Sequence, residues 1–206
     1  MSTLYIAPGA CSLASHIVVR ELDLPIHIET VALRTSESPI HRINPLGRVP
    51  ALQVEEGGVL TENSAVLPYL ADLKPGTSLF APAGTLERAQ IQSWIGYLAA
   101  EVHTASIRPL NRPERYSADE AAHPGIRAQA QVQLLKAFEH IERHLTDRQW
   151  LVGERYTIAD AYLGVFASWL TRIGGPFEQL VAVKKLRDNW LARPAVQAVL
   201  KAEGLI

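Results

Sequence analysis

The stretch Leu4-Tyr5-Ile6-Ala7-Pro8-Gly9-Ala10-Cys11 decides how the chain begins to fold. Its apolar run, residues 4–6, is typical of a short strand, and the Pro8-Gly9 pair predicts a turn directly after it. Between Cys11 and Leu22, apolar residues recur at the spacing of one helical face. We therefore expect a strand, a tight turn and a helix, with Cys11 at or beside the start of the helix.

The residues that follow continue to mix strands and helices. Further strands are predicted at 26–31, 49–54 and 59–60, and further helices at 36–43 and 62–73. Pro50 suits the start of its strand because proline has no N–H to give to a sheet, and Gly57-Gly58 predicts a hairpin turn. The predicted order over residues 1–77 is β-α-β-α-β-β-α.

The second part of the chain is predicted to be entirely helical. Apolar residues follow helical spacing over 91–102, 126–145, 157–173 and 180–191. Thr157-Ile158-Ala159-Asp160 has the pattern of a capping box, in which Asp160 reaches back toward Thr157. We expect an α+β domain at 1–77, a linker at 78–84 rich in proline and glycine, and an all-α domain at 85–206.

Composition excludes several classes of protein. The 206 residues are 48% hydrophobic and 20% charged, as in a globular chain with a sizeable core. Twenty Lys and Arg against 21 Asp and Glu leave a net charge of −1, which argues against nucleic-acid or membrane partners. One cysteine excludes an internal disulfide. No secretory signal or membrane span is recognised, so we expect a cytoplasmic protein.

Cys11 is the first candidate for chemistry. A helix N-terminus stabilises an anion, so a cysteine there is expected to have a lowered thiol pKa. The alternative is that Cys11 is a small buried hydrophobe, and its position alone leaves both interpretations open. Ser12 follows as a candidate hydroxyl partner for a bound thiol.

Two further segments are candidates for binding an extended ligand. A cis bond before Pro50 would leave the backbone N–H and C=O of Val49 free to pair with a ligand, whereas an ordinary trans proline would not. Glu62 and Asn63 open a helix whose N–H groups suit a carboxylate, while the Glu62 side chain suits an ammonium. The alternative is simple capping of that helix by Thr61.

Histidines and arginines supply the remaining candidates. His103 lies one step off an apolar stripe, and either contacts a ligand or is a partly exposed helix residue. The loop with Arg108, Arg112 and Arg115 either flanks an acidic substrate or is merely solvated. The pair of histidines at 140 and 144 shares a helix face, but no third ligand is evident, so we expect no metal.

These pieces together resemble the cytosolic glutathione transferases, most closely the bacterial beta class. The likeness covers nearly the whole chain, because five motifs occur in the family's order. They are Ala7–His16, Asn44–Leu52 (the family's N-P-x-G-x-V-P-x-L), Leu60–Leu70, Thr157–Asp160 and Arg193–Val196. In the beta class, cysteine occupies the position that holds tyrosine or serine in other classes.

The resemblance implies a thioredoxin-like domain, an all-helical domain, a homodimer, and glutathione as a co-substrate without a metal. It also implies roles for single residues. Cys11 would lie beside the glutathione sulfur, Val49 and Pro50 would present backbone to its cysteinyl part, Glu62 and Asn63 would hold its γ-glutamyl end, and His103 would lie near its thiol or glycyl end. Two positions depart from the family's pattern. Asn63 stands where the family often has serine or glycine, and Thr104 stands where the beta class often has lysine.

Three functions are consistent with these implications. The first is a glutathione transferase that joins the glutathione thiolate to small hydrophobic electrophiles, a detoxification reaction. The second is a glutathione-dependent thiol oxidoreductase or peroxidase, in which Cys11 forms mixed disulfides. The third is a non-catalytic interaction module of the same fold. Cys11 favours the two enzymes over the module.

Overall fold

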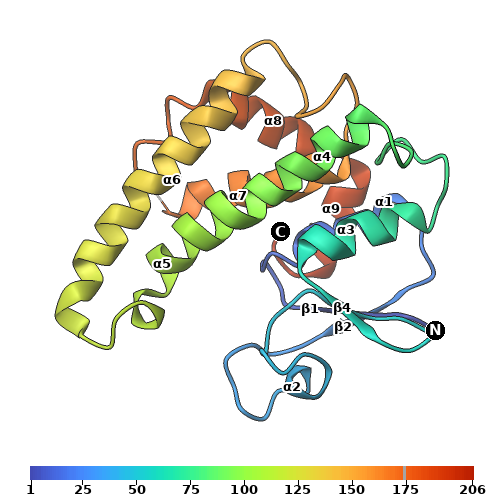
Figure 1. Ribbon diagram of the computed structural model, residues 1–206, viewed down its shortest axis with the longest axis horizontal. Coiled ribbons are helices and arrows are strands. Elements are labelled where there is room, and N and C mark those ends of the chain that lie inside the picture. Colours follow the sequence, from blue (N-terminus) through green and yellow to red (C-terminus); the bar gives the residue numbers. More distant parts are fainter. Residues whose placement is uncertain (174) are drawn as a thin grey trace.

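The computed structural model describes residues 1–173 and 175–206 (Figure 1). A small mixed sheet lies at the N-terminal end of the chain. Its strands are β1 (Thr3–Ile6), β2 (His27–Thr30), β3 (Ala51–Gln53) and β4 (Val59–Thr61). They are arranged in the order β2-β1-β3-β4, with β1 parallel to β2 and antiparallel to β3, and β4 antiparallel to β3. This is the thioredoxin-like arrangement that the sequence predicts.

Helices make up most of the rest of the described chain. Those beside the sheet are α1 (Leu13–Glu21), α2 (Ile40–Ile43) and α3 (Asn63–Asp72). Those of the second part are α4 (Leu86–Tyr97), a π-helical segment (Leu98–Ile107), α5 (Arg108–Asn111), short 3-10 turns (Pro113–Arg115 and Glu120–Ala122), α6 (His123–Leu145), α7 (Ile158–Ile173), α8 (Val181–Leu191) and α9 (Pro194–Ala202). The predicted combination of an α+β part and an all-α part is confirmed.

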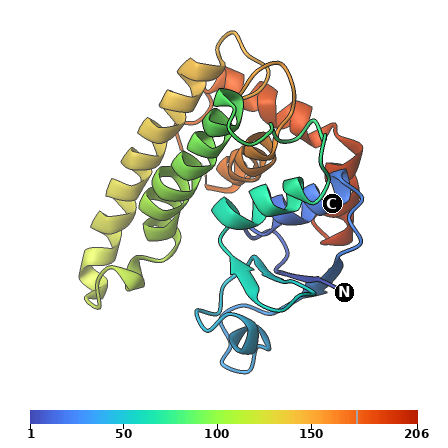
Figure 2. The same ribbon diagram turned by 45° about the vertical axis from the view of Figure 1, so that its right-hand side comes forward.

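The sheet separates two apolar clusters. Leu4, Ile6 and Leu52 point toward α1 and α3 and belong to the main core. Ala51 points the other way, where it packs with Ile40 of α2 in a smaller cluster. Figures 1 and 2 show α1 and α3 on one side of the strands and α2 on the other. The alternation along each strand therefore creates one large core and a small one under α2.

Helix α7 is the centre of the second part, as its apolar sequence predicts. It packs against α1 of the first part and against α4 and α8 of the second. Gly164 is required there, since a Cβ at that position would lie 2.4 Å from the buried indole of Trp190. Contact between α7 and α1 holds the two parts of the chain together at the level of the turn that carries Cys11.

The capping box at the start of α7 is confirmed and is more extensive than predicted. The N–H and hydroxyl groups of Thr157 both donate to Asp160 Oδ2, at 2.9 and 2.8 Å. The N–H of Leu151 donates to the other carboxylate oxygen at 2.8 Å. Burial raises the pKa of Asp160 to about 6, and the donated hydrogen bonds oppose that rise. Asp160 thus holds the preceding loop as well as the helix.

One helix differs from the prediction. The pattern over 91–102 predicts an ordinary α-helix, but from Leu98 to Ile107 the backbone is π-helical, with the Arg108 N–H donating to the carbonyl of His103. π-Helical turns occur frequently at functional sites.

Among the described residues, no helix combines the length and apolarity needed to cross a membrane.

Candidate functional site

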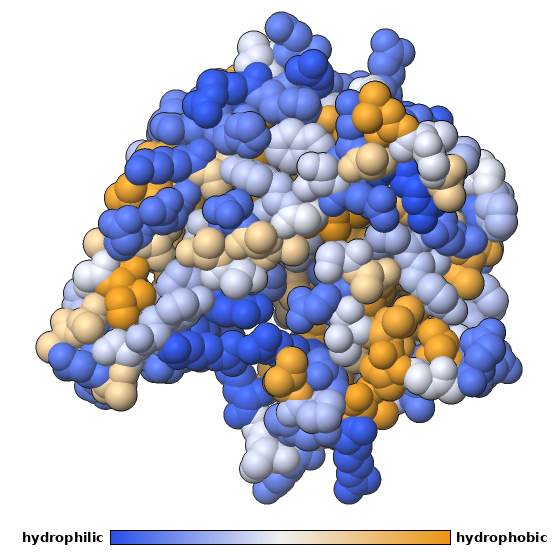
Figure 3. Space-filling model, in the orientation of Figure 1, coloured by the Kyte–Doolittle hydropathy of each residue, from blue (hydrophilic) through white to orange (hydrophobic). Residues whose placement is uncertain are grey.

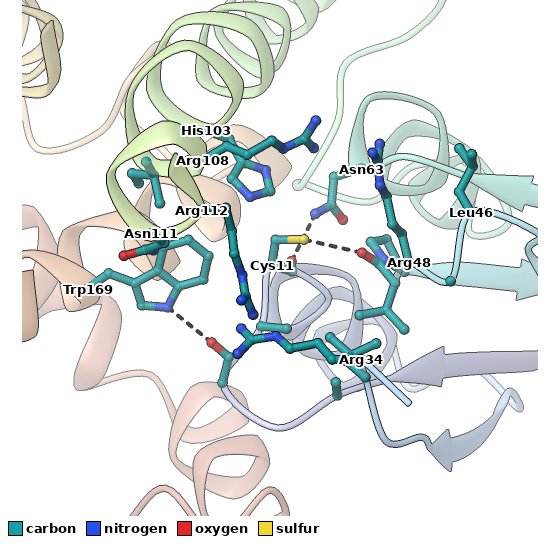
Figure 4. A pocket seen from close by; sticks show the side chains of 18 of the residues that line it. Cys11, Arg34, Leu46, Arg48, Asn63, His103, Arg108, Asn111, Arg112 and Trp169 are labelled. Carbon is teal, nitrogen blue, oxygen red and sulfur yellow. Dashed lines mark hydrogen bonds between the residues drawn. The ribbon is translucent and has the colours of Figure 1, made fainter. Parts of the chain in front are cut away.

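A pocket of about 1250 Å³ opens between the sheet-containing part and the helical part. Its walls come from the turn after β1, the loop before β3, the start of α3, the segment from His103 to Arg115, and α7. Figure 3 shows a notch on this face, bordered by strongly hydrophilic side chains, and Figure 4 shows residues of the pocket around Cys11. Cys11, Val49, Pro50, Glu62, Asn63 and His103 all line it, and their roles toward a ligand stay a prediction.

Cys11 lies in the pocket, and its surroundings raise the pKa of its thiol. Helix α1 begins at Leu13, so Cys11 precedes the first turn, and its Sγ donates a hydrogen bond to the Val49 carbonyl at 3.3 Å. Burial, together with the nearby carboxylate of Glu62, raises the pKa of the thiol to about 12. The predicted lowering of this pKa is therefore wrong, because loss of hydration outweighs the N–H groups beside the sulfur.

Ser12 is turned away from the pocket and does not act on a ligand there. It is fully buried, and its hydroxyl accepts the N–H of Ala7 at 3.2 Å and donates to the Ala7 carbonyl at 3.4 Å. These bonds close the turn between β1 and α1. The structure therefore corrects the assignment of Ser12 as a catalytic candidate: its hydroxyl shapes the backbone that presents Cys11.

The peptide bond between Val49 and Pro50 is cis, which was one of the two predicted outcomes. Val49 is 8% exposed, lies outside the β3 ladder, and borders the pocket. Its carbonyl already accepts the thiol of Cys11, a contact that the sequence did not predict. The loop before β3 and the turn after β1 are thereby joined directly across the pocket floor.

The start of α3 presents free donors rather than a capped end. Among the described residues, neither the Thr61 nor the Glu62 side chain accepts from its first turn, and pairing of its N–H groups starts only at Ala65, with the Glu62 carbonyl. Glu62 has φ +67°, an uncommon backbone conformation for a residue other than glycine and one that clusters at ligand sites. The alternative of simple capping by Thr61 is therefore wrong, and the first N–H groups of α3 face the pocket without a side-chain partner.

Asn63 requires a partial correction. Its side chain is only 3% exposed; the amide nitrogen donates to the Cys11 carbonyl at 2.8 Å, and the amide oxygen accepts the Ser15 hydroxyl at 2.6 Å. The side chain thus fixes the turn that carries Cys11 and has little capacity left for a ligand. Only the backbone of Asn63 remains suited to bind one.

His103 enters the pocket from the π-helical segment (Figure 4). Its ring packs 5.4 Å from the ring of Phe166 and 5.9 Å from that of Trp169, both on α7. Burial, and then the positive charges of Arg108 and Arg48, lower its pKa to about 4. His103 is therefore neutral near pH 7, so it can exchange a hydrogen bond with a ligand but does not supply a positive charge.

The turn after β1 is anchored by residues that the sequence analysis missed. Trp169 donates through its indole to the Gly9 carbonyl at 3.1 Å, and the Gly9 N–H donates to Glu203 at 2.9 Å. Glu203 also pairs with His16 at 2.8 Å, with both side chains almost fully buried. Since 194 residues separate Gly9 from Glu203, local patterns gave no signal of this contact. It clamps the backbone two residues before Cys11.

The histidines at 140 and 144 take part in packing. His144 is bonded through Nε2 to the Leu151 carbonyl at 2.8 Å, and its ring lies 4.6 Å from that of Trp94. His140 packs against Trp94 and Tyr97. These contacts give both histidines a role in holding α4 and α6 together.

Comparison with known proteins identifies the family to which this site belongs. Residues 9–73 match the family model described as glutathione S-transferase, N-terminal domain, and residues 120–202 match that of the C-terminal domain. The chain belongs to the glutathione S-transferase family. The glutathione S-transferase GST-4.5 of Xanthomonas campestris is 38% identical over 203 residues, which cover 98% of each chain.

Solved glutathione S-transferases have the same fold. A bacterial beta class enzyme from Sphingomonas chungbukensis is 34% identical, with a TM-score of 0.89 over 99% of this chain and all of that chain. A sphingomonad glutathione S-transferase solved in complex with glutathione is 33% identical, also with a TM-score of 0.89, over 99% of this chain and all of that one. The likeness to this family, and to its beta class, is confirmed.

Proposed function

We propose that this glutathione S-transferase family member is an enzyme that conjugates glutathione to small electrophiles. The observation that carries the proposal is the set of polar groups without partners among the described residues that line the pocket with Cys11: the first N–H groups of α3, the Glu62 carboxylate and the N–H of Val49. Glutathione has two carboxylates, an ammonium and an extended peptide backbone. The related sphingomonad enzyme, with the same fold, was solved with glutathione bound.

In the proposed complex, each part of glutathione meets a group of matching chemistry. The N–H groups that open α3 receive the γ-glutamyl carboxylate, where the helix dipole favours an anion. Glu62 accepts the γ-glutamyl ammonium through a charge-assisted hydrogen bond. The Val49 backbone pairs with the cysteinyl part, which brings the glutathione sulfur close to Cys11 and His103.

The proposed reaction is a nucleophilic substitution by sulfur. The glutathione thiol loses its proton to solvent, and the thiolate attacks the electrophilic carbon, so that a C–S bond forms while the leaving group departs with the bonding electrons. Positive charge in the pocket lowers the pKa of the bound glutathione thiol. Cys11, held protonated by burial, would donate a hydrogen bond to that thiolate in place of the one it gives to Val49.

Thiol exchange by Cys11 is the second candidate function, and the geometry favours it less. An exchange reaction requires Cys11 itself to be the attacking thiolate. Its raised pKa and its hydrogen bond to the Val49 carbonyl both keep it protonated in the free protein. Conjugation, in which the reacting sulfur belongs to glutathione, has no such requirement.

We also propose the family's assembly and division into domains for this chain. A homodimer is supported by large apolar side chains exposed on the single chain, among them Leu46, Leu86 and Val132. Sedimentation at micromolar concentration is expected to give about twice the 22.7 kDa of one chain, and a species with the mass of one chain would contradict the homodimer.

A linker between the two domains at 78–84 is supported by its place between the end of α3 and the start of α4.

The test of the proposed activity is a rate measurement with 1-chloro-2,4-dinitrobenzene and glutathione. The wild-type protein is expected to accelerate conjugation saturably in both substrates, and Cys11→Ala to retain a measurable part of that rate. Exchange with glutathione disulfide is measured on the same two proteins. Absence of conjugation, combined with exchange that Cys11→Ala abolishes, would replace the proposed function with the oxidoreductase.

A further inference from the structure

Arginine dominates the charge of the pocket. Seven arginines line it, against a single carboxylate, Glu62. The arginines are Arg34, Arg48, Arg108, Arg112, Arg115, Arg127 and Arg172. With histidines counted as neutral, seven positive charges and one negative charge leave a net +6 in a chain whose overall charge is −1. Positive charge is therefore concentrated at this one place.

Glutathione alone does not balance this charge. Its two carboxylates and one ammonium give a net −1 with the thiol protonated, which would leave +5 in the pocket. Several of the arginines also lie away from the groups proposed to bind glutathione. Arg112 and Arg115 come from the segment after α5, and Arg172 comes from the end of α7, whereas the glutathione groups come from the sheet-containing part.

The pocket arginines differ from other arginines in how they are paired. Outside the pocket, half of the eight arginines have a carboxylate oxygen within 2.9 Å, namely Arg88, Arg155, Arg187 and Arg193. Within the pocket, only Arg112 has a carboxylate partner in the described part of the chain, Glu114 at 3.3 Å. Like charges placed close together repel, so this arrangement is unfavourable unless an anion lies among them.

Arg112 supplies the most specific observation. Its Nη2 is buried and has no hydrogen-bond acceptor among the described residues. An unsatisfied buried donor is costly, and one on a guanidinium is more so. Figure 4 shows Arg112 extending into the pocket from the helical side and Arg34 extending into it from the sheet side. A ligand oxygen in this part of the pocket would accept from a donor that the protein leaves unpaired.

We infer that the second substrate is an anionic electrophile, a small molecule with a carboxylate near its reactive carbon, and that Arg112 and Arg115 bind this carboxylate. The inference rests on the proposed conjugation reaction and names its substrate class. A guanidinium binds a carboxylate with two parallel hydrogen bonds, which orients it as well as attracting it. A pocket for purely hydrophobic electrophiles would not need these arginines.

The test uses two electrophiles that differ in one charge: 4-chloro-3,5-dinitrobenzoate and its methyl ester. In each, the glutathione thiolate attacks the carbon that carries chlorine, a C–S bond forms, chloride leaves with its electron pair, and the thiol proton goes to solvent. Each kcat/KM is divided by the uncatalysed rate constant with glutathione, because the ester is intrinsically more reactive. We expect the normalised value to favour the acid by about tenfold or more, as for one charge-assisted hydrogen bond.

Variants separate specific recognition from general attraction. Arg112→Gln and, independently, Arg115→Gln are expected to reduce the preference for the acid by about fivefold or more. Arg20→Gln removes an exposed arginine of α1 outside the pocket and is the matched control, expected to preserve the preference. Thermal melting checks that each variant is folded. Raising the salt concentration from about 0.05 M to about 0.5 M is expected to diminish the preference.

The outcomes distinguish this inference from the proposed function. Turnover of the ester with no normalised preference for the acid would overturn the inference and leave the transferase function intact. A preference that neither arginine variant changes would overturn the assignment to Arg112 and Arg115. Turnover of neither compound, nor of 1-chloro-2,4-dinitrobenzene, would overturn the transferase function and the inference together.

Discussion

The surroundings of the Asp160 carboxylate and of the Arg112 guanidinium differ in how completely their buried polar groups are hydrogen-bonded. Around Asp160, three donors from Leu151 and Thr157 meet the two carboxylate oxygens. Around Cys11, Arg112 leaves a buried donor without an acceptor, and the start of α3 has no cap. Buried polar groups are normally satisfied, so the complete set indicates a structural role, whereas an unpaired donor on a residue that lines the pocket, as Arg112 does, is suited to a ligand.

Removing the hydrogen bonds to Asp160 is expected to have the largest effect on stability. Asp160→Ala leaves the N–H groups of Leu151 and Thr157 buried without acceptors, which predicts a loss of about 3–5 kcal/mol in the free energy of unfolding. Urea denaturation measures it. Asp160→Asn retains one acceptor oxygen and is expected to lose less. A loss below about 1 kcal/mol in the alanine variant would show that the network is not structural in this sense.

The burial of His103, together with the nearby charges of Arg108 and Arg48, is expected to make stability depend on pH. The pKa of His103 is about 4 in the folded protein and 6.5 when unperturbed, so between these values the unfolded chain binds more protons. Stability from this group is fully present above pH 6.5 and is lost as pH falls through 4, by up to about 3 kcal/mol. Asp160 acts oppositely, because its folded pKa is raised.

The measurement is urea denaturation between pH 7 and pH 4 on wild type and His103→Gln. We expect the variant to lose less stability on acidification, since it has no imidazole to protonate. Equal losses in the two proteins would contradict a lowered pKa of His103 in the folded protein.

A smaller effect is expected at Cys11. Burial keeps its pKa high, and the Glu62 carboxylate adds to that. The wild-type thiol is therefore expected to react slowly with iodoacetamide at pH 7, and Glu62→Gln to react faster because a nearby negative charge is removed. Rates measured against pH report the thiolate fraction. A wild-type thiol that titrates near 8.5 or below would contradict the account of a protonated, half-buried Cys11.

Local patterns predicted most of the fold. The strand, turn and helix around Pro8-Gly9 and the reach of Asp160 to Thr157 were both found, because each depends on residues close in sequence. The π-helical segment was not predicted, since its apolar spacing differs little from that of an α-helix. The direction of the Cys11 pKa shift was also missed, because burial depends on how distant elements pack over the thiol.

The candidate site was predicted in its location but not in the roles of all its members. Residue type alone could not show that the side chains of Ser12 and Asn63 are occupied by backbone groups of their own turn. The clamp on Gly9 by Trp169 and Glu203 joins residues far apart in the chain. The sequence groups only the arginines of one loop, and the fold brings Arg34, Arg48, Arg127 and Arg172 into the same pocket.

The central claim is that the polar groups without hydrogen-bond partners in the pocket of Cys11 form a glutathione site. Calorimetry of glutathione binding tests this claim most directly. Wild type is expected to bind saturably, and Glu62→Gln to bind about tenfold or more weakly, because a charge-assisted hydrogen bond to the ammonium is lost. Arg20→Gln, outside the pocket, is expected to bind like wild type. No heat at millimolar glutathione, or equal affinity in wild type and Glu62→Gln, would contradict the account.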